Sequence, residues 1–244
     1  ISLGLTLPNK KKPKKRALTD AEKKLIFKAD FNSMERVFID LLYYTGIRKG
    51  EALSLTVSDI DFINKKIHIN KTLVVKDNTS EIKYSPKTNA GNRIIPDKLL
   101  QSLMNYIHSI NSIYLFTTED GNLLTLSEFR KIWRDVIYKL NLAAGGTIPK
   151  QGKRKKEDVG KRPIWLIAND ITPHMFRHTY ATNLYYAGID VKTAQRLLGH
   201  SSIQITLDIY THLDNQQISA SINKINDFFN AQNNLSDSQN IVNL

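Results

Sequence analysis

The chain has 244 residues, with 35 Lys plus Arg against 23 Asp plus Glu and no cysteine. The net charge of +12 favours a polyanionic partner such as nucleic acid, although a basic chain can also bind anionic lipid or simply remain soluble. The lack of cysteine excludes disulfides, thiolate metal sites and thiol nucleophiles. The apolar stretches are far shorter than the roughly 20 residues that span a bilayer, and no signal peptide is recognisable. We therefore expect a cytoplasmic protein with no membrane partner.

Residues 1–18 are predicted to form a basic linker, because the run from Lys10 to Arg16 is highly charged and interrupted by Pro13. Such a run is typical of a solvated tether, and it can also lie along DNA phosphates. Its candidate DNA-binding residues are Lys10, Lys11, Lys12, Lys14, Lys15 and Arg16. The first residue is Ile1 and not Met, so we expect functional segments upstream.

Three helices are predicted next. Order begins at Thr19, whose spacing to Glu22 is that of a capping box. A second helix begins at about Ser33, with apolar residues at helical period, and Gly46 suits its C-terminus. A short helix from Arg48 to Leu55 follows.

The pattern then changes to the alternation typical of strands. Residues 66–75 alternate and are rich in β-branched side chains, as is the stretch 93–96, and residues 89–92 have the composition of a turn. We predict a small antiparallel sheet over about 59–96. Helical periodicity returns over 97–108 and again over 126–140.

Residues 141–163 interrupt the helical pattern. They contain four glycines and a basic cluster, which consists of Lys153, Arg154, Lys155 and Lys156. An irregular insertion of this length in a compact domain is usually functional or disordered. We expect a basic insertion whose four clustered residues contact DNA.

The C-terminal part is predicted to be helical. Thr172 and Pro173 begin one helix that ends near Gly188, and a second runs from Asp190 to Gly199. Two further helices are expected over 203–210 and 216–229, followed by a flexible tail over 233–244.

Three short motifs contain the candidate chemistry, and each also has an ordinary structural interpretation. His174 and Arg177 stand three apart near a helix N-terminus, where they could bind an anion or form a solvated pair. Arg48 and Glu51 have the same spacing and could form a surface salt bridge. Tyr210 follows His200 by ten positions (210 − 200). Most tyrosines, however, are core or rim residues, and this histidine could simply end a helix.

The inventory of residues excludes several other kinds of site. The histidines show no metal-ligand spacing, no carboxylate cluster suits magnesium, and there is no glycine-rich phosphate loop. The remaining cations and hydroxyls suit chemistry on a phosphate group without a metal ion or other cofactor.

Taken together, in this order and at these spacings, the motifs resemble the tyrosine recombinase (phage integrase) family over about 19–229. The resemblance implies a mainly α-helical α+β catalytic domain over 19–232, with a small antiparallel sheet. The insertion at 141–163 is similar to the extra β-type element in integrases of conjugative transposons and related phages.

The family builds one site from an Arg, a Lys, a His-x-x-Arg pair, a His or Trp, and a Tyr. The corresponding catalytic positions here are Arg48, Lys87, His174, Arg177, His200 and Tyr210, with Glu51 as a supporting residue. The lysine assignment has an alternative in Lys83, but the Pro-Lys-Thr context favours Lys87.

The resemblance also implies how the reaction runs. The two arginines bind the non-bridging phosphate oxygens, to which His200 adds a hydrogen bond. Tyr210 forms a 3′-phosphotyrosine bond, its pKa lowered by the arginines and its proton accepted by His174. Lys87 protonates the departing 5′-oxygen. Neither ATP nor a metal ion is required.

The implied partners are double-stranded DNA and three further copies of the chain, in a tetramer on paired sites. The segment 216–229 is expected to dock on a neighbouring copy or, alternatively, on its own domain. Two rival functions remain: a type IB topoisomerase-like activity that relaxes DNA, and a DNA-binding or architectural protein that uses its basic charge alone.

Overall fold

The structure is a computed structural model that describes residues 16–76, 79–84, 91–147, 164–167, 170–215, 217–218 and 222. Several predictions fall outside the described residues. These are the linker lysines before Arg16, Lys87, the cluster Lys153–Lys156, the tail over 233–244 and most of the segment 216–229.

Both N-terminal helices begin with a capping box, of which the sequence predicted the first. In α1 (Asp20–Lys28), Thr19 and Glu22 form the capping box that the sequence predicts. In α2 (Ser33–Thr45), Asn32 and Glu35 form another, and the helix ends at Gly46 with a left-handed φ of 60°. The short α3 (Lys49–Leu53) is shorter than the predicted helix over 48–55, because a 3-10 turn at Val57–Asp59 follows it closely.

The predicted sheet is present as two smaller antiparallel sheets. The first contains β1 (Ile60–Asp61), β2 (Lys66–His68) and β5 (Asn92–Ile94), in the order β1-β2-β5. The second pairs β3 (Lys71–Lys76) with β4 (Thr79–Tyr84). The stretch 66–75 was expected to be one strand, but it divides after His68, and β2 and β3 pair with different partners.

Two longer helices follow, α4 (Asp97–Ser109) and α5 (Leu126–Ala143). The predicted insertion was expected to begin at residue 141, but α5 continues through this position because Asn141 is fully buried. Its side-chain amide donates to the carbonyls of Thr147 and Ile164, both at 2.9 Å. The amide N–H of Thr147 also donates to the carbonyl of Ile164 at 2.9 Å, so the two ends of the insertion are paired at its base.

The C-terminal helices α6 (Pro173–Tyr186) and α7 (Val191–Leu198) lie close to their predicted positions. Asp190 caps α7 through the backbone amides of residues 192 and 193, and Gly199 ends it with φ 63°. A further helix covers 203–215, and residues 217, 218 and 222 are also helical. The predicted end near Tyr210 is therefore wrong, because the helix continues past this residue.

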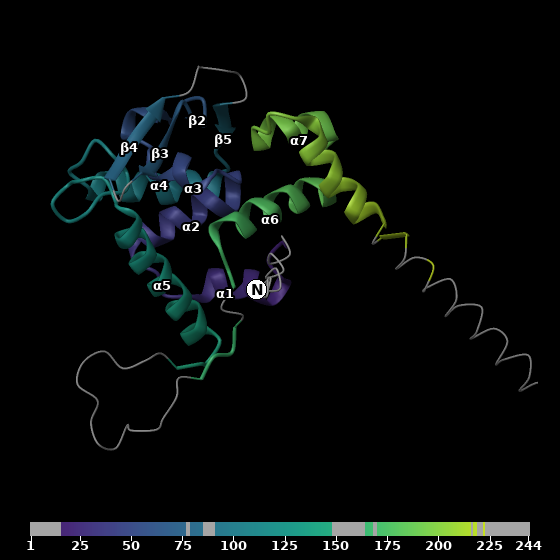
Figure 1. The fold of residues 1–244 in the computed structure, drawn as a ribbon, viewed down its shortest axis with the longest axis horizontal. Coiled ribbons are helices and arrows are strands. Elements are labelled where there is room, and N and C mark those ends of the chain that lie inside the picture. The colour runs from purple at the N-terminus through teal and green to yellow at the C-terminus, as the bar shows by residue number, and fades with distance from the viewer. Residues whose placement is uncertain are drawn as a thin grey trace, which may run out of the picture.

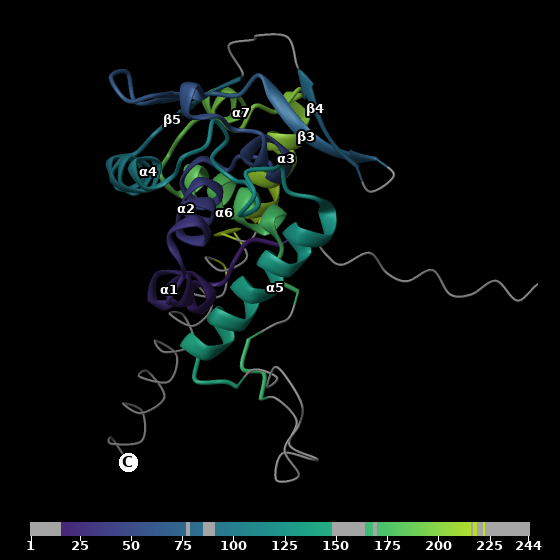
Figure 2. The same ribbon diagram turned by 90° about the vertical axis from the view of Figure 1, so that its left-hand side faces the viewer.

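Helix α2 lies at the centre of the molecule and packs against α4 and α6. Both sheets lie at one end, with α1 and the C-terminal end of α5 at the other (Figures 1 and 2). A large apolar core joins α1 to α5, while a smaller cluster joins α6, α7 and the helix over 203–215. None of the described helices has the length and apolar character needed to cross a membrane.

Candidate active site

A pocket of about 200 Å³ collects side chains from four separate segments of the chain. Its lining residues are Arg48, His174, Arg177, His178, His200, Ile205 and Ile209. We call it the cation pocket. The segments meet because α2 and α7 both pack against α6, which brings the start of α3 and the end of α7 to the first turn of α6.

Arg48 lies at the N-cap of α3 and is held by Glu51. The guanidinium donates to one carboxylate oxygen of Glu51 at 2.7 Å, while the backbone amide of Arg48 donates to the other at 3.0 Å. A second guanidinium nitrogen lies 3.3 Å from the carbonyl of Gly199. The Arg48 side chain is 46% exposed, so it remains accessible to a ligand in the pocket while its carboxylate partner sets its direction.

Arg177 is buried and held by backbone carbonyls. It donates to the carbonyl of Gly46 at 2.8 Å and to that of Leu198 at 2.7 Å. Burial, followed by repulsion from Arg48, lowers the pKa of Arg177 to about 9, so the side chain is still a cation at neutral pH. Both carbonyls lie at helix C-termini, where the backbone carries partial negative charge that suits an arginine.

Arg93 is a residue near the site that the sequence motifs do not identify. It lies on β5, is 2% exposed and donates to the same Leu198 carbonyl as Arg177, at 3.0 Å. Burial lowers its pKa, while the charge of Glu51 raises it. The only signal in the sequence was the strand alternation, which places Arg93 on the same face as Ile95. The structure buries both of these residues and exposes Ile94 between them. A charged residue on the buried side of a strand needs a partner.

His200 follows the C-cap of α7 and is also buried. Its backbone N–H donates to the carbonyl of Gln195 at 3.1 Å. Its Nδ1 lies 2.8 Å from the hydroxyl of Thr206, on the helix that contains Tyr210. Burial, followed by the charges of Arg177 and Arg48, lowers the pKa of His200 to about 4, so its ring is neutral at physiological pH.

The two histidines of α6 lie next to each other at the mouth of the cation pocket. His174 is exposed and His178 is half-buried, and their ring centroids are 4.9 Å apart with the planes nearly perpendicular. His178 was not a candidate from the sequence, although it lies one helical turn beyond His174 on the same face.

Tyr210 lies outside the cation pocket in this conformation. Its hydroxyl donates to the carbonyl of Ile189 at 3.0 Å, and its ring packs edge-on against Tyr185 with centroids 5.1 Å apart. Burial, followed by the negative charge of Asp190, raises the pKa of Tyr210 to about 12. The expected lowering by the arginines is therefore absent here, because the side chain packs in the α6–α7 cluster.

A second contact fixes the same helix. The Tyr185 hydroxyl on α6 donates to the carboxylate of Asp214, one turn beyond Tyr210, and lies 3.2 Å from the side-chain oxygen of Gln217. The hydrogen bond with Asp214 raises the pKa of Tyr185 to about 12. We call the contacts of Tyr210 with Ile189 and Tyr185, and of Tyr185 with Asp214, the tyrosine latch.

Arg16 is the only predicted DNA-binding residue among those that the structure describes. Its guanidinium donates to both carboxylate oxygens of Glu22 at 2.7 Å, and to Asp170 at 2.9 Å. These two ion pairs connect the chain before α1 to residue 170.

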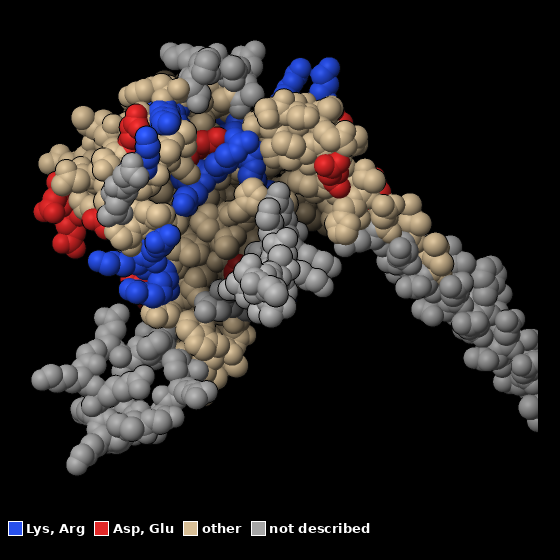
Figure 3. Space-filling model, in the orientation of Figure 1, with Lys and Arg blue, Asp and Glu red and all other residues tan. Residues whose placement is uncertain are grey.

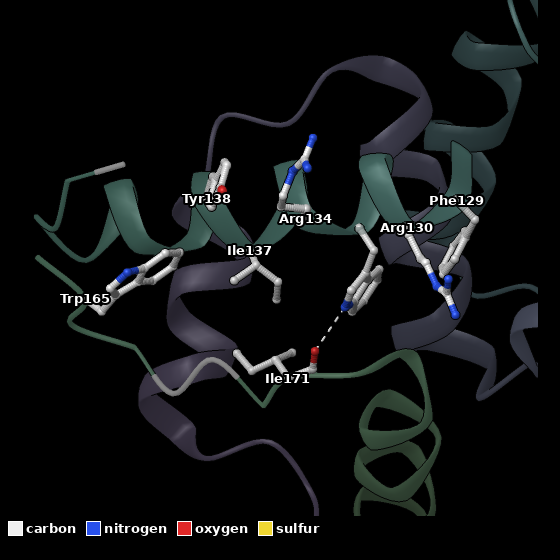
Figure 4. A pocket seen from close by; sticks show the side chains of 8 residues that line it. Phe129, Arg130, Arg134, Ile137, Tyr138, Trp165 and Ile171 are labelled. Atoms are coloured by element: carbon white, nitrogen blue, oxygen red, sulfur yellow. Dashed lines mark hydrogen bonds between the residues drawn. The ribbon is translucent and has the colours of Figure 1, made fainter. Parts of the chain in front are cut away.

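A roomier pocket of about 350 Å³ lies between α5 and the chain that returns from the insertion (Figure 4). Its walls are mostly apolar and aromatic, with Arg130 and Arg134 among the lining residues. The Trp133 indole N–H donates to the carbonyl of Ile171 at 3.0 Å, directly before α6. This pocket contains none of the motif residues, so its size does not make it the site of chemistry.

Lys and Arg side chains gather on one face of the molecule (Figure 3). Arg48 is followed by Lys49, whose Nζ lies 4.9 Å from the centroid of the Phe129 ring on α5. Burial, followed by the charge of Arg130, lowers the pKa of Lys49. Lys131 and Arg134 are exposed on α5, where Arg134 lies 3.8 Å from the carboxylate of Asp135.

Known proteins share the sequence pattern and the fold of this chain. The profile of the phage integrase family matches residues 16–217. The chain belongs to that family. It is 29% identical to a tyrosine recombinase XerC-like protein of Caldanaerobacter subterraneus over 214 residues, covering 78% of this chain and 48% of that protein.

A second phage integrase relative is the tyrosine recombinase XerC of Staphylococcus aureus. It is 32% identical over 195 residues, which cover 77% of this chain and 51% of the relative. The chain therefore spans about half the length of the curated relatives it matches.

Solved structures of the family share the fold. The Tn1549 transposon integrase, in a complex with transposon right end DNA, has a TM-score of 0.63 at 26% identity, over 84% of this chain and 64% of that one. The XerA recombinase has a TM-score of 0.55 at 25% identity, over 92% and 68%. These matches confirm the predicted α+β, mainly helical tyrosine recombinase catalytic fold.

Proposed function

We propose that this chain is the catalytic part of a site-specific DNA recombinase of a mobile element, acting in the cytoplasm of its host. It cuts and rejoins duplex DNA through a covalent bond to Tyr210. The observation that carries the proposal is the cation pocket, where Arg48, Arg177 and His200 converge on a space that suits one phosphodiester.

The cation pocket would act on the transition state. A phosphodiester carries one negative charge, and its pentacovalent transition state places more on the non-bridging oxygens. The two arginines donate to those oxygens through paired N–H groups, and His200 adds a neutral donor. Such preorganised donors are usually the largest contribution to catalysis in a site of this kind.

Each phosphoester bond that breaks in the reaction is replaced by another phosphoester bond. The Tyr210 oxygen attacks phosphorus, the bond from phosphorus to the 5′-oxygen breaks, and a 3′-phosphotyrosine forms. His174 accepts the tyrosine proton and Lys87 protonates the 5′-oxygen. A 5′-hydroxyl of another strand then reverses these steps. The phosphoester energy is conserved, so ATP is not consumed, and the arginines supply the charge that a metal ion would otherwise supply.

The nucleophile must first leave the tyrosine latch. Its hydroxyl is bonded to the carbonyl of Ile189, so the tyrosine has to rotate or its helix has to shift before attack. DNA or a second copy of the chain can drive this change only if it binds the conformation with Tyr210 released more tightly than the latched one.

The experiment that tests the proposal is trapping on a suicide substrate. A duplex with a nick close to the cleavage position loses its 5′-hydroxyl strand after attack, so the covalent adduct accumulates. Mass spectrometry should locate the adduct on Tyr210. A protein that binds this duplex without forming an adduct would be a DNA-binding or architectural protein. One that forms adducts and relaxes supercoiled DNA, but never exchanges strands, would be topoisomerase-like.

The role of Lys87 has its own test. A substrate whose 5′-bridging oxygen is replaced by sulfur has a leaving group that departs without a proton. Lys87→Ala should be inactive on the oxygen substrate and active on the sulfur one. Lys83→Ala is the control, because Lys83 is exposed on β4 close by in the sequence. Rescue of the Lys83 variant instead would move the role to that residue.

Assembly as a tetramer is also part of the proposal. The residues after Asp214 support it, because Ile218 and Ile222 are 58% and 51% exposed and could be buried on a neighbouring copy. Truncation after Gln217 removes both isoleucines and keeps Asp214 and Gln217, the two hydrogen-bond partners of the Tyr185 hydroxyl. It should therefore prevent assembly on paired sites while single-site binding survives. Normal assembly by the truncated chain would contradict this part of the proposal.

A further inference from the structure

The hydrogen bond between His200 and Thr206 connects two parts of the site. Thr206 lies on the helix over 203–215, one turn before Tyr210, and is fully buried. Its hydroxyl lies 2.8 Å from Nδ1 of His200, which is 7% exposed. The bond therefore fixes the imidazole from the side of the nucleophile's helix, and it leaves Nε2 as the ring nitrogen that can face the pocket.

The direction of this bond follows from the other threonines of the chain. The buried hydroxyls of Thr45 and Thr179 each donate to the carbonyl four residues earlier in their helices, at 2.7 and 2.8 Å. Among the described residues, Thr206 Oγ1 makes no such bond, and its one hydrogen-bond partner is His200 Nδ1. If Nδ1 carried the proton, the buried Thr206 hydroxyl would keep its own proton without an acceptor, which is unfavourable. Thr206 therefore donates to Nδ1.

A neutral imidazole carries one proton, so an Nδ1 that accepts a hydrogen bond places this proton on Nε2. Phosphate oxygens only accept hydrogen bonds, and the Nε2–H form is the neutral form that can donate to them. We propose that Thr206 is a positioning residue that holds His200 in the Nε2–H tautomer, ready to donate to a non-bridging phosphate oxygen. The phosphate part rests on the proposed function, whereas the tautomer does not.

The charges around His200 agree with a neutral ring. Burial, followed by repulsion from Arg177, Arg48 and Arg93, lowers its pKa to about 4. Protonation therefore cannot supply the donor at physiological pH. Because the ring stays neutral, its ability to donate a hydrogen bond from Nε2 depends on its tautomer. The group that is hydrogen-bonded to Nδ1 determines that tautomer.

The direct test is nitrogen NMR of the chain with labelled histidine, without DNA. The His200 signals, assigned by comparison with His200→Asn, should show a protonated Nε2 and an unprotonated Nδ1. Thr206→Ser should keep this pattern, because the hydroxyl remains. Thr206→Val, nearly the same shape without the hydroxyl, should shift the ring to a mixture or to the Nδ1–H form. Thr211→Val, at an exposed position of the same helix, is the matched control.

The wild-type spectrum decides the proposal even if a variant fails to fold. A protonated Nδ1 in the wild-type protein would overturn it, and so would an unchanged tautomer in a folded Thr206→Val variant. Because no DNA is used, these results do not depend on whether the chain cleaves DNA. Absence of any covalent adduct in the wild-type protein would contradict the proposed function and leave the tautomer assignment standing.

A kinetic test extends the proposal to the phosphate. Thr206→Val should slow single-turnover cleavage by about 10-fold, the effect typical of losing an outer hydrogen-bond partner, with DNA affinity unchanged. Thr206→Ser should restore the rate. In a His200→Ala background, Thr206→Val should have no further effect, because its target is absent. An equal loss in both backgrounds would mean that Thr206 has only a structural role, and would overturn its assignment to His200.

Discussion

The cation pocket and the tyrosine latch both use side chains of α6 and of the helix over 203–215, and they differ in what holds them. In the pocket, Arg48 and Arg177 are oriented by a carboxylate and by backbone carbonyls, before any ligand is bound. In the latch, the same kinds of contact hold Tyr210 away from those arginines. The groups proposed to stabilise charge are thus preorganised, while Tyr210, the proposed nucleophile, is not, and we expect its release to be a separate step that assembly on DNA controls.

The largest expected effect comes from Tyr210→Phe. Covalent attachment to a nicked duplex should be abolished, and DNA affinity should be unchanged. The free energy of unfolding should fall by about 1 kcal/mol, because the part-buried hydrogen bond to the carbonyl of Ile189 is lost. Tyr186→Phe, at a position that is 62% exposed, is the control and should cleave normally. Adducts formed by the Tyr210 variant would reveal another nucleophile.

Substitution of the two arginines should have similar effects on the cleavage rate but different effects on the free energy of unfolding. Arg48→Lys and Arg177→Lys should each slow single-turnover cleavage by about 10²–10³-fold, because lysine lacks the planar pair of donors. Only Arg177→Lys should also lower the free energy of unfolding, by about 1–3 kcal/mol, since it alone is buried and bonded to two carbonyls. Near-normal cleavage by either variant would remove that arginine from the site.

Opening the latch should have a smaller effect in the opposite direction. Asp214→Ala removes the charged acceptor of the Tyr185 hydroxyl at an exposed position and leaves the side-chain oxygen of Gln217 as its other partner, so the latch should weaken only slightly. Adduct formation should therefore become about 2–5-fold faster. Asp208→Ala removes the same charge from the same helix and should leave the rate unchanged. A slower reaction in the Asp214 variant would show that the latch contacts support the active conformation.

An effect on stability alone, and not on the rate of cleavage, is expected from the pH dependence. The pKa of His200 is about 4 in the folded chain, below its ordinary value of 6.5, so the unfolded chain takes up the proton first. The free energy of unfolding should then decrease as the pH falls from about 6.5 to 4, by on the order of 2 kcal/mol after allowance for solvent in the pocket. Chemical denaturation of the wild-type chain and of His200→Asn should show that the variant lacks this contribution.

Local sequence signals predicted most of the fold. Capping residues and the glycines at 46 and 199 predicted the helix ends, because these depend on neighbouring residues. The helix over 203–215 was predicted too short, since no glycine or proline marks the position after Tyr210 and only packing determines where it ends. The division of the sheet also depends on contacts between distant strands, which alternation alone does not encode.

For the candidate site, the motif residues were found but their arrangement was not. Four of the six proposed catalytic residues lie together in the cation pocket, Tyr210 lies outside it, and Lys87 is outside the described residues. Residues three apart on a helix share a face, which predicted the pairing of Arg48 with Glu51. Arg93 contacts a remote segment, whereas Thr206 belongs to the motif that contains Tyr210, and neither residue was assigned a role from the sequence.

The paired ends of the insertion have a consequence for how this chain could have changed over time. Thr147 and Ile164 are hydrogen-bonded to each other, and the Asn141 amide closes the base from inside. Since entry and exit are adjacent, residues between them can be lengthened, shortened or exchanged without moving α5 or α6. A lineage could thus adopt a new accessory surface at this point while its chemistry stays intact. The same joint offers an engineer a place to graft a different peptide.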